Sequence, residues 1–145
     1  MVKQTTKVPL RFHRDGSFRV LMLTDLHGGV KHSPKLTAGI EALLQSEHPD
    51  LVLLGGDISV DTGYDGGICT PELLHAYLSD ILEPLHRRGI PWAHVYGNHD
   101  REVGMTDAEM QAVYESFPLC LSSAGPEEIS GCSNYVLPII SSKID

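Results

Sequence analysis

Three short stretches of the sequence carry side chains that could bind metal ions. They are TDLHGG at residues 24–29, GGDIS at 55–59 and GNHDRE at 97–102. Together they supply six polar side chains, namely Asp25, His27, Asp57, Asn98, His99 and Asp100. Carboxylate, amide and imidazole groups form the mixed oxygen and nitrogen donor set that holds manganese, iron, zinc or nickel. The chemistry that these residue types favour is therefore metal-dependent.

Each stretch taken alone has a simpler explanation. Asp25 and His27 could belong to an ordinary loop with a helix cap, and glycine, aspartate and asparagine are common turn residues. Three separate turns would, however, have to select metal-ligand side chains by chance, each directly after an apolar segment. The joint pattern therefore indicates one functional site.

The elements around these stretches follow from the spacing of apolar residues. Residues 18–24, 51–54 and 92–96 predict strands, and residues 34–47 and 71–88 predict amphipathic helices. This β-α-β-α-β order predicts an α/β fold with a parallel sheet, right-handed crossovers and cover on both faces. The three polar turns then lie together at the carboxyl ends of the strands, where open α/β folds bind ligands.

The remainder of the chain predicts a looser continuation of the same domain. A helix is expected at 107–116 and a strand at 135–140, with glycine, proline and serine between them. With 145 residues, 41% of them hydrophobic, the chain fits a single domain with its own core. Three cysteines without a CxxC pair favour reduced thiols over a disulfide framework or a cysteine-ligated zinc site.

Composition argues against several classes of partner. The net charge of -8 disfavours binding along a nucleic-acid backbone, which depends on many lysines and arginines. Every apolar run is far shorter than the roughly 20 residues that span a bilayer, so no membrane helix is expected. The N-terminal residues lack an apolar segment and a small-residue cleavage site, so no signal peptide is predicted and a cytoplasmic location is expected.

The series DLH, GGD and GNHD resembles the N-terminal half of the calcineurin-like metallophosphoesterase superfamily, between residue 20 and about residue 102. The resemblance implies a four-layer α-β-β-α sandwich of two packed sheets. It also implies an enzyme that hydrolyses phosphomonoesters or phosphodiesters with a metal-bound hydroxide at a binuclear site. The alternative is a non-catalytic scaffold with the same fold, because a fold does not dictate an activity.

The same resemblance implies ligands for two divalent ions. Asp25 and His27 would bind the first ion, Asp57 would bridge both ions, and Asn98 would bind the second. The overall charge agrees with this, because an acidic protein needs cations to attract an anionic phosphoester. The metals remain open among manganese, iron, zinc and nickel.

Two further residues gain catalytic roles from the resemblance. His99 would lie beside the substrate phosphate, and Asp100 would orient its ring. His99 would either protonate the departing oxygen or stabilise the developing charge, and the sequence leaves both roles open. A scaffold has no need for a histidine at this place, which favours the enzyme.

Two departures from the superfamily pattern refine the prediction. Purple acid phosphatases have a tyrosine and a glycine where this chain has Val60 and His27, which argues against a tyrosinate-iron site and towards the general bacterial-type branch. The pattern also continues with histidines, including a GHxH motif, whereas this chain has none after His99. We therefore expect a truncated domain, with the first sheet, its helices and the start of the second sheet, that has little or no activity alone.

Such an unfinished second sheet also predicts self-association. Apolar surface and an unpaired strand edge near residues 135–140 would favour it. Among the other histidines, only His32 is a candidate for lining the site, and the remainder are predicted to be structural. Asp61, Tyr64 and Asp65 could contact the substrate, although a simple turn explains them equally well.

Overall fold

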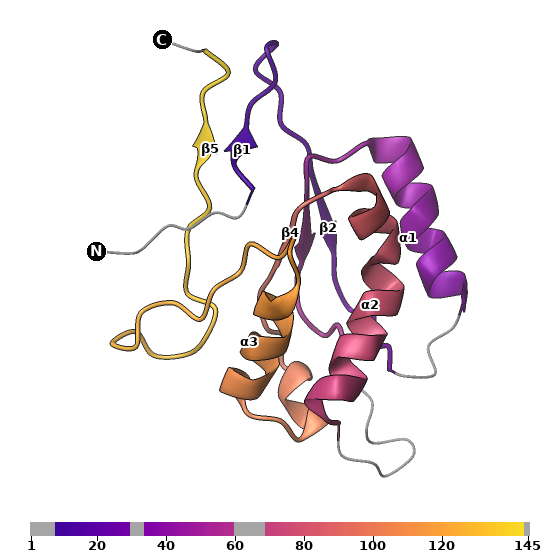
Figure 1. The fold of residues 1–145 in the computed structure, drawn as a ribbon, viewed down its shortest axis with the longest axis vertical. Coiled ribbons are helices and arrows are strands. Elements are labelled where there is room, and N and C mark those ends of the chain that lie inside the picture. Colours follow the sequence, from indigo (N-terminus) through magenta and orange to yellow (C-terminus); the bar gives the residue numbers. More distant parts are fainter. Residues whose placement is uncertain (1–7, 30–33, 60–68, 144–145) are drawn as a thin grey trace.

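The computed structural model describes residues 8–29, 34–59 and 69–143, shown in Figure 1. Its elements in chain order are β1 (Leu10–Arg11), β2 (Val20–Leu23), α1 (Pro34–Glu47), β3 (Leu51–Leu54), α2 (Pro71–Arg88), β4 (Trp92–His94), the 3-10 helix η1 (Asp100–Val103), α3 (Asp107–Ser116) and β5 (Ile139–Ile140). No helix in these described ranges has the length and apolar character needed to cross a membrane.

The three helices begin and end where the sequence predicts. In α2, the Thr70 side chain accepts a hydrogen bond from the Leu73 N–H, and Gly89 ends the helix with a left-handed φ of 67°. In α3, Thr106 and Glu109 form a reciprocal capping box. These local signals satisfy the backbone groups at helix ends, which explains why the bounds could be predicted.

The main sheet contains three parallel strands in the order β2-β3-β4. Met22 pairs with Leu53, and Leu53 pairs with Ala93. The outer strands are shorter than predicted, with β2 at Val20–Leu23 and β4 at Trp92–His94. The central strand β3 has four residues, and its length limits the pairing that either neighbour can make.

Helices pack on one face of this sheet. The main core cluster joins buried residues of all three helices, among them Leu44, Leu78 and Tyr114, with Val52 and Trp92 of the sheet. The opposite face carries a smaller cluster in which Leu10, Leu51, Ala93 and Leu121 are buried. Cover on both faces was predicted. In the structure, helices cover one face, and the other face is only partly covered.

A second, two-stranded parallel sheet lies away from α1, where β1 and β5 run side by side (Figure 1). Leu10 pairs with Ile139, and Arg11 pairs with Ile140. The predicted strand at 135–140 is only two residues long, Ile139–Ile140, and pairs with β1 on one side. The predicted self-association through an unpaired edge stays a prediction. Parallel sheets with helices agree with a partial metallophosphoesterase architecture.

Candidate metal centre

The first two polar turns run side by side, directly after β2 and β3. The Asp25 N–H donates to the Gly56 carbonyl at 3.1 Å, and the His27 N–H donates to the Asp57 carbonyl at 3.0 Å. These bonds continue the pairing of β2 with β3 beyond the ends of the two strands. The sheet thereby brings the two turns into register.

Three side chains in these turns stand on unusual backbone. The φ angles of Asp25, His27 and Asp57 are 55°, 45° and 52°, in the left-handed region that side chains other than glycine seldom adopt. Such strain costs on the order of 1 kcal/mol or more per residue, and it persists where surrounding contacts hold it. The inter-turn hydrogen bonds supply those contacts, and strain of this kind is concentrated at functional sites.

The same three residues bring their ligand atoms together. One ligand atom each from Asp25, His27 and Asp57 lies within 4.8 Å of the other two. The Asp25 Oδ1 is 3.6 Å from the His27 Nε2, and Asp57 is only 7% exposed. The carboxylates of Asp25 and Asp57, with ligand atoms within 4.8 Å, repel each other, and the His27 imidazole beside them completes a mixed donor set. The chemistry of the donor set therefore fits a divalent transition metal.

The third turn is attached to the first two through Asp57. The His99 N–H donates to the Asp57 Oδ1 at 2.8 Å. A Cβ placed on Gly97 would lie 2.2 Å from that same Oδ1, so only glycine fits there. Asn98 lies between Gly97 and His99 in the chain and is exposed. Asn98 thus belongs to the turn that is joined to Asp57, and its role as a metal ligand stays a prediction.

The sequence led us to expect Asp100 against the His99 ring, but its carboxylate binds backbone groups instead. Its carboxylate is buried and accepts three backbone N–H bonds, from Asp57 at 2.8 Å, Gly97 at 2.7 Å and Ile58 at 3.0 Å. Asp100 therefore joins the second turn to the third. Its oxygens already satisfy three backbone donors, two of them buried, which explains why the imidazole has another partner.

The partner of the His99 ring is Glu102. The Glu102 Oε1 lies 2.9 Å from the His99 Nδ1. This carboxylate, mainly through its hydrogen bond, raises the pKa of His99 above its usual value of 6.5. The ring centroids of His99 and His27 are 5.7 Å apart. The structure thus places the His99 imidazole beside the cluster, with a carboxylate against Nδ1.

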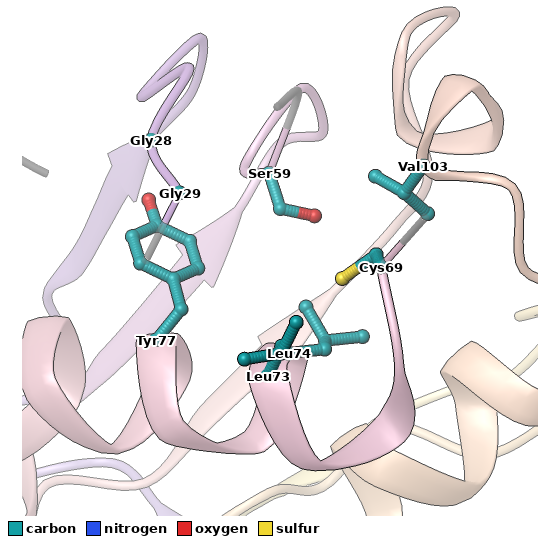
Figure 2. A pocket seen from close by; sticks show the side chains of 8 residues that line it. All are labelled: Gly28, Gly29, Ser59, Cys69, Leu73, Leu74, Tyr77 and Val103. Atoms are coloured by element: carbon teal, nitrogen blue, oxygen red, sulfur yellow. The ribbon is translucent and has the colours of Figure 1, made fainter. Parts of the chain in front are cut away.

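Tyr77 of α2 supports the turns from the core side (Figure 2). Its hydroxyl donates to the Ile58 carbonyl at 2.9 Å, and a Cβ on Gly28 would lie 2.1 Å from the hydroxyl oxygen. Cys69 and Val103 face Tyr77 across a cavity of about 10 Å³. A space of that size holds about one water molecule, so it cannot admit a substrate.

A family model described as calcineurin-like phosphoesterase matches residues 18–139. The chain belongs to this family. The matched range contains all three polar turns, so membership agrees with the resemblance of the DLH, GGD and GNHD series. Family membership supports metal-dependent hydrolysis in general terms and leaves the number and identity of the metals untested.

Relatives of this calcineurin-like chain include both plant and microbial proteins. Probable inactive purple acid phosphatase 14 of Arabidopsis thaliana is 28% identical, over 90% of this chain and 36% of its own length. Phosphatase DCR2 of Saccharomyces cerevisiae is 30% identical, over 88% of this chain and 24% of its own. Phosphodiesterase YaeI of Escherichia coli is 36% identical, over 66% of this chain and 33% of its own.

The chain thus spans only about a quarter to just over a third of the length of these curated relatives. No solved structure matches it. Relatives named as purple acid phosphatases occur beside bacterial hydrolases, so the predicted branch within the family stays a prediction.

Several predicted residues lie outside the described part of the chain. They are His32, Val60, Asp61, Tyr64 and Asp65. Two contributors at the site were not predicted. Glu102 follows His99 by three residues, a spacing that a 3-10 helix brings together, whereas nothing in the sequence distinguishes Tyr77 from a core residue of α2.

Proposed function

We propose that Asp25, His27, Asp57 and Asn98 bind two divalent metal ions and that the resulting site hydrolyses phosphoesters. The observation that carries this proposal is the meeting of ligand atoms from two strand-end turns within 4.8 Å, on strained backbone. Membership of the calcineurin-like family supports the same conclusion. When bound, the ions would supply positive charge for an anionic substrate and acidify a water molecule.

Asp57 holds the two halves of the site together. Its carbonyl accepts the His27 N–H, and its Oδ1 accepts the His99 N–H at 2.8 Å. Because it is bonded to both the first and the third turn, Asp57 is the residue best placed to serve both ions. The second hydrogen bond also restricts the rotation of its carboxylate, so the ligand oxygens are preorganised before a metal arrives.

His99 acts on the substrate and not on the metal in this proposal. Its ring is partly exposed beside the cluster, and Nδ1 is engaged with Glu102. The raised pKa keeps a larger share of the imidazole protonated near neutral pH, which suits a group that donates a hydrogen bond or a proton to phosphate oxygen.

Metal binding tests the proposal directly. The chain and three variants, Asp57→Asn, Asn98→Ala and the charge-matched control Glu127→Gln in an exposed loop, are titrated with manganese by calorimetry. We expect Asp57→Asn to weaken all binding by about tenfold or more, Asn98→Ala to weaken only the second ion, and the control to match the wild type. Equal loss of both ions in both site variants contradicts the assignment, as does an absence of binding in the wild type.

Hydrolysis is measured separately with a chromogenic phosphoester and added manganese, on this chain and on any longer product of its gene. We expect His99→Ala to keep its metals and lower kcat, most strongly for substrates with poor leaving groups if His99 donates the proton. Loss of the metals would make His99 structural instead.

A non-catalytic scaffold remains the second candidate. The observation that favours it is the similarity, over 90% of this chain, to a plant relative that is named as a probable inactive purple acid phosphatase. Tight metal binding without turnover in the longest gene product would support the scaffold.

A further inference from the structure

The carboxylate against His99 comes from a residue that the sequence pattern does not single out. Glu102 approaches the Nδ1 of His99 to 2.9 Å, whereas Asp100 is 1% exposed and occupied by three backbone donors. The tautomer and ring orientation of a histidine are set by the group that binds one of its nitrogens. Glu102 is the residue in that position here.

The local backbone favours the contact between His99 and Glu102. His99 is the residue before η1, and in a 3-10 helix side chains three positions apart lie above one another. The Glu102 N–H also donates to the His99 carbonyl at 2.8 Å, so backbone and side chains join the same two residues.

Both ends of the short helix are anchored. The His99 N–H is bound to Asp57, which holds the start of the helix at the cluster. At the other end, Val103 is buried, and its carbonyl accepts the Cys69 N–H at 3.2 Å. The backbone positions of His99 and Glu102 are therefore fixed by folded structure on both sides, while their side chains are 42% and 61% exposed.

We propose that Glu102 is a positioning residue, which keeps a hydrogen on the Nδ1 of His99 and thereby presents Nε2 to the substrate. The proposal rests on the proposed function for what Nε2 does. The hydrogen-bond geometry applies whether or not the ring is protonated, because a carboxylate only accepts and Nδ1 must donate to it. A neutral ring is thus confined to one tautomer, and a charged ring is confined to one orientation.

The deciding experiment reads the tautomer itself, in the presence of a chelator. Long-range 1H–15N correlation spectra of the chain distinguish Nδ1–H from Nε2–H in a neutral histidine. We expect Nδ1–H to predominate for His99 in the wild type and in Glu102→Gln, whose amide oxygen still accepts. In Glu102→Ala we expect the ratio to reverse, and the matched control Glu127→Ala to leave it unchanged.

An unchanged tautomer in Glu102→Ala overturns the proposal, and so does predominant Nε2–H in the wild type. Backbone amide shifts of residues 100–103 show whether η1 persists in the variants; a reversed ratio in Glu102→Ala together with an intact helix supports positioning. If η1 is lost in Glu102→Ala, the Glu102→Gln variant decides, because it keeps both the acceptor and the backbone donor. Predominant Nδ1–H in this variant then supports the proposal, and predominant Nε2–H overturns it.

Activity gives a second readout where the site turns over. We expect Glu102→Ala to lower kcat by roughly tenfold or more with KM changed less than about twofold, and Glu102→Gln to restore most of the loss. A higher KM with an unchanged kcat would contradict positioning. If no hydrolysis is found at all, the proposed function fails while the tautomer experiment still decides the role of Glu102.

Discussion

On the helix-covered face of the main sheet even an imidazole is buried, whereas on the partly covered opposite face several apolar side chains are exposed. His94 is 1% exposed, but Val20, Met22 and Val95 are 48%, 63% and 49% exposed. The strand register places these last three on the same side of the sheet, away from the helices. Burial in this molecule therefore depends on which elements cover a face more than on the hydrophobicity of the residue.

His94 shows what such burial requires of a polar group. Its ring stacks on Tyr114 with centroids 3.7 Å apart, and its Nδ1 is 2.8 Å from the Ser122 Oγ. Its Nε2 lies 3.3 Å from the Ser133 Oγ. Desolvation lowers the pKa of His94 to about 3, so the ring stays neutral. The exposed valines and methionine on the other face have no corresponding cover.

The largest effect is expected where a charged group is buried. Replacing Asp100 with alanine removes the acceptor of three backbone N–H groups, two of them buried and one partly buried. We expect Asp100→Ala to lower the free energy of unfolding by about 3–5 kcal/mol, measured by urea denaturation. The control Asp25→Asn, at an exposed carboxylate of the same site, should stay within about 0.5 kcal/mol. Equal effects in the two variants would show that burial of the carboxylate does not decide how much it contributes to stability.

The pH dependence of the free energy of unfolding tests the burial of the His94 imidazole. The unfolded chain binds a proton at His94 below its usual pKa of 6.5, whereas the folded chain does so only near its pKa of about 3. Stability therefore falls as the pH drops from 6.5 towards 3, and the part due to His94 reaches about 2 kcal/mol at pH 5. Urea denaturation at pH 7 and pH 5 should show this part in the wild type and not in His94→Gln. The same pH dependence in both proteins would mean that His94 is not the responsible group.

The smallest effect on stability is expected on the open face. Met22→Gln should change the free energy of unfolding by less than about 0.5 kcal/mol, whereas the same substitution at the buried Met110 of α3 should cost several times more. Because exposed apolar side chains favour association, we also expect Met22→Gln to weaken self-association of the chain in sedimentation velocity. A wild type that stays monomeric at every concentration would contradict that second expectation.

The local features of the fold could be predicted because they depend on neighbouring residues. The bounds of α1, α2 and α3 follow from apolar periodicity, with capping residues at α2 and α3, and the three polar turns follow the predicted strands. The meeting of Asp25, His27 and Asp57 could be predicted in outline from their residue types and their places after the strands. The internal contacts of the site could not, because Asp100 and Glu102 are both carboxylates near His99 and sequence distance alone does not choose between them.

The sequence by itself determined the order of the three main-sheet strands and the three α-helices, the three polar turns and the family, but neither β1 nor η1 was predicted. Only the tertiary structure decided that Asp100 binds the backbone of the second turn, more than 40 residues earlier in the chain, and that Glu102 takes the His99 ring. It also decided that β5 pairs with β1, and that helices cover one face of the main sheet. The physical reason is that local patterns encode propensity and periodicity, whereas these contacts depend on which distant segments compete for the same backbone donors and apolar surfaces.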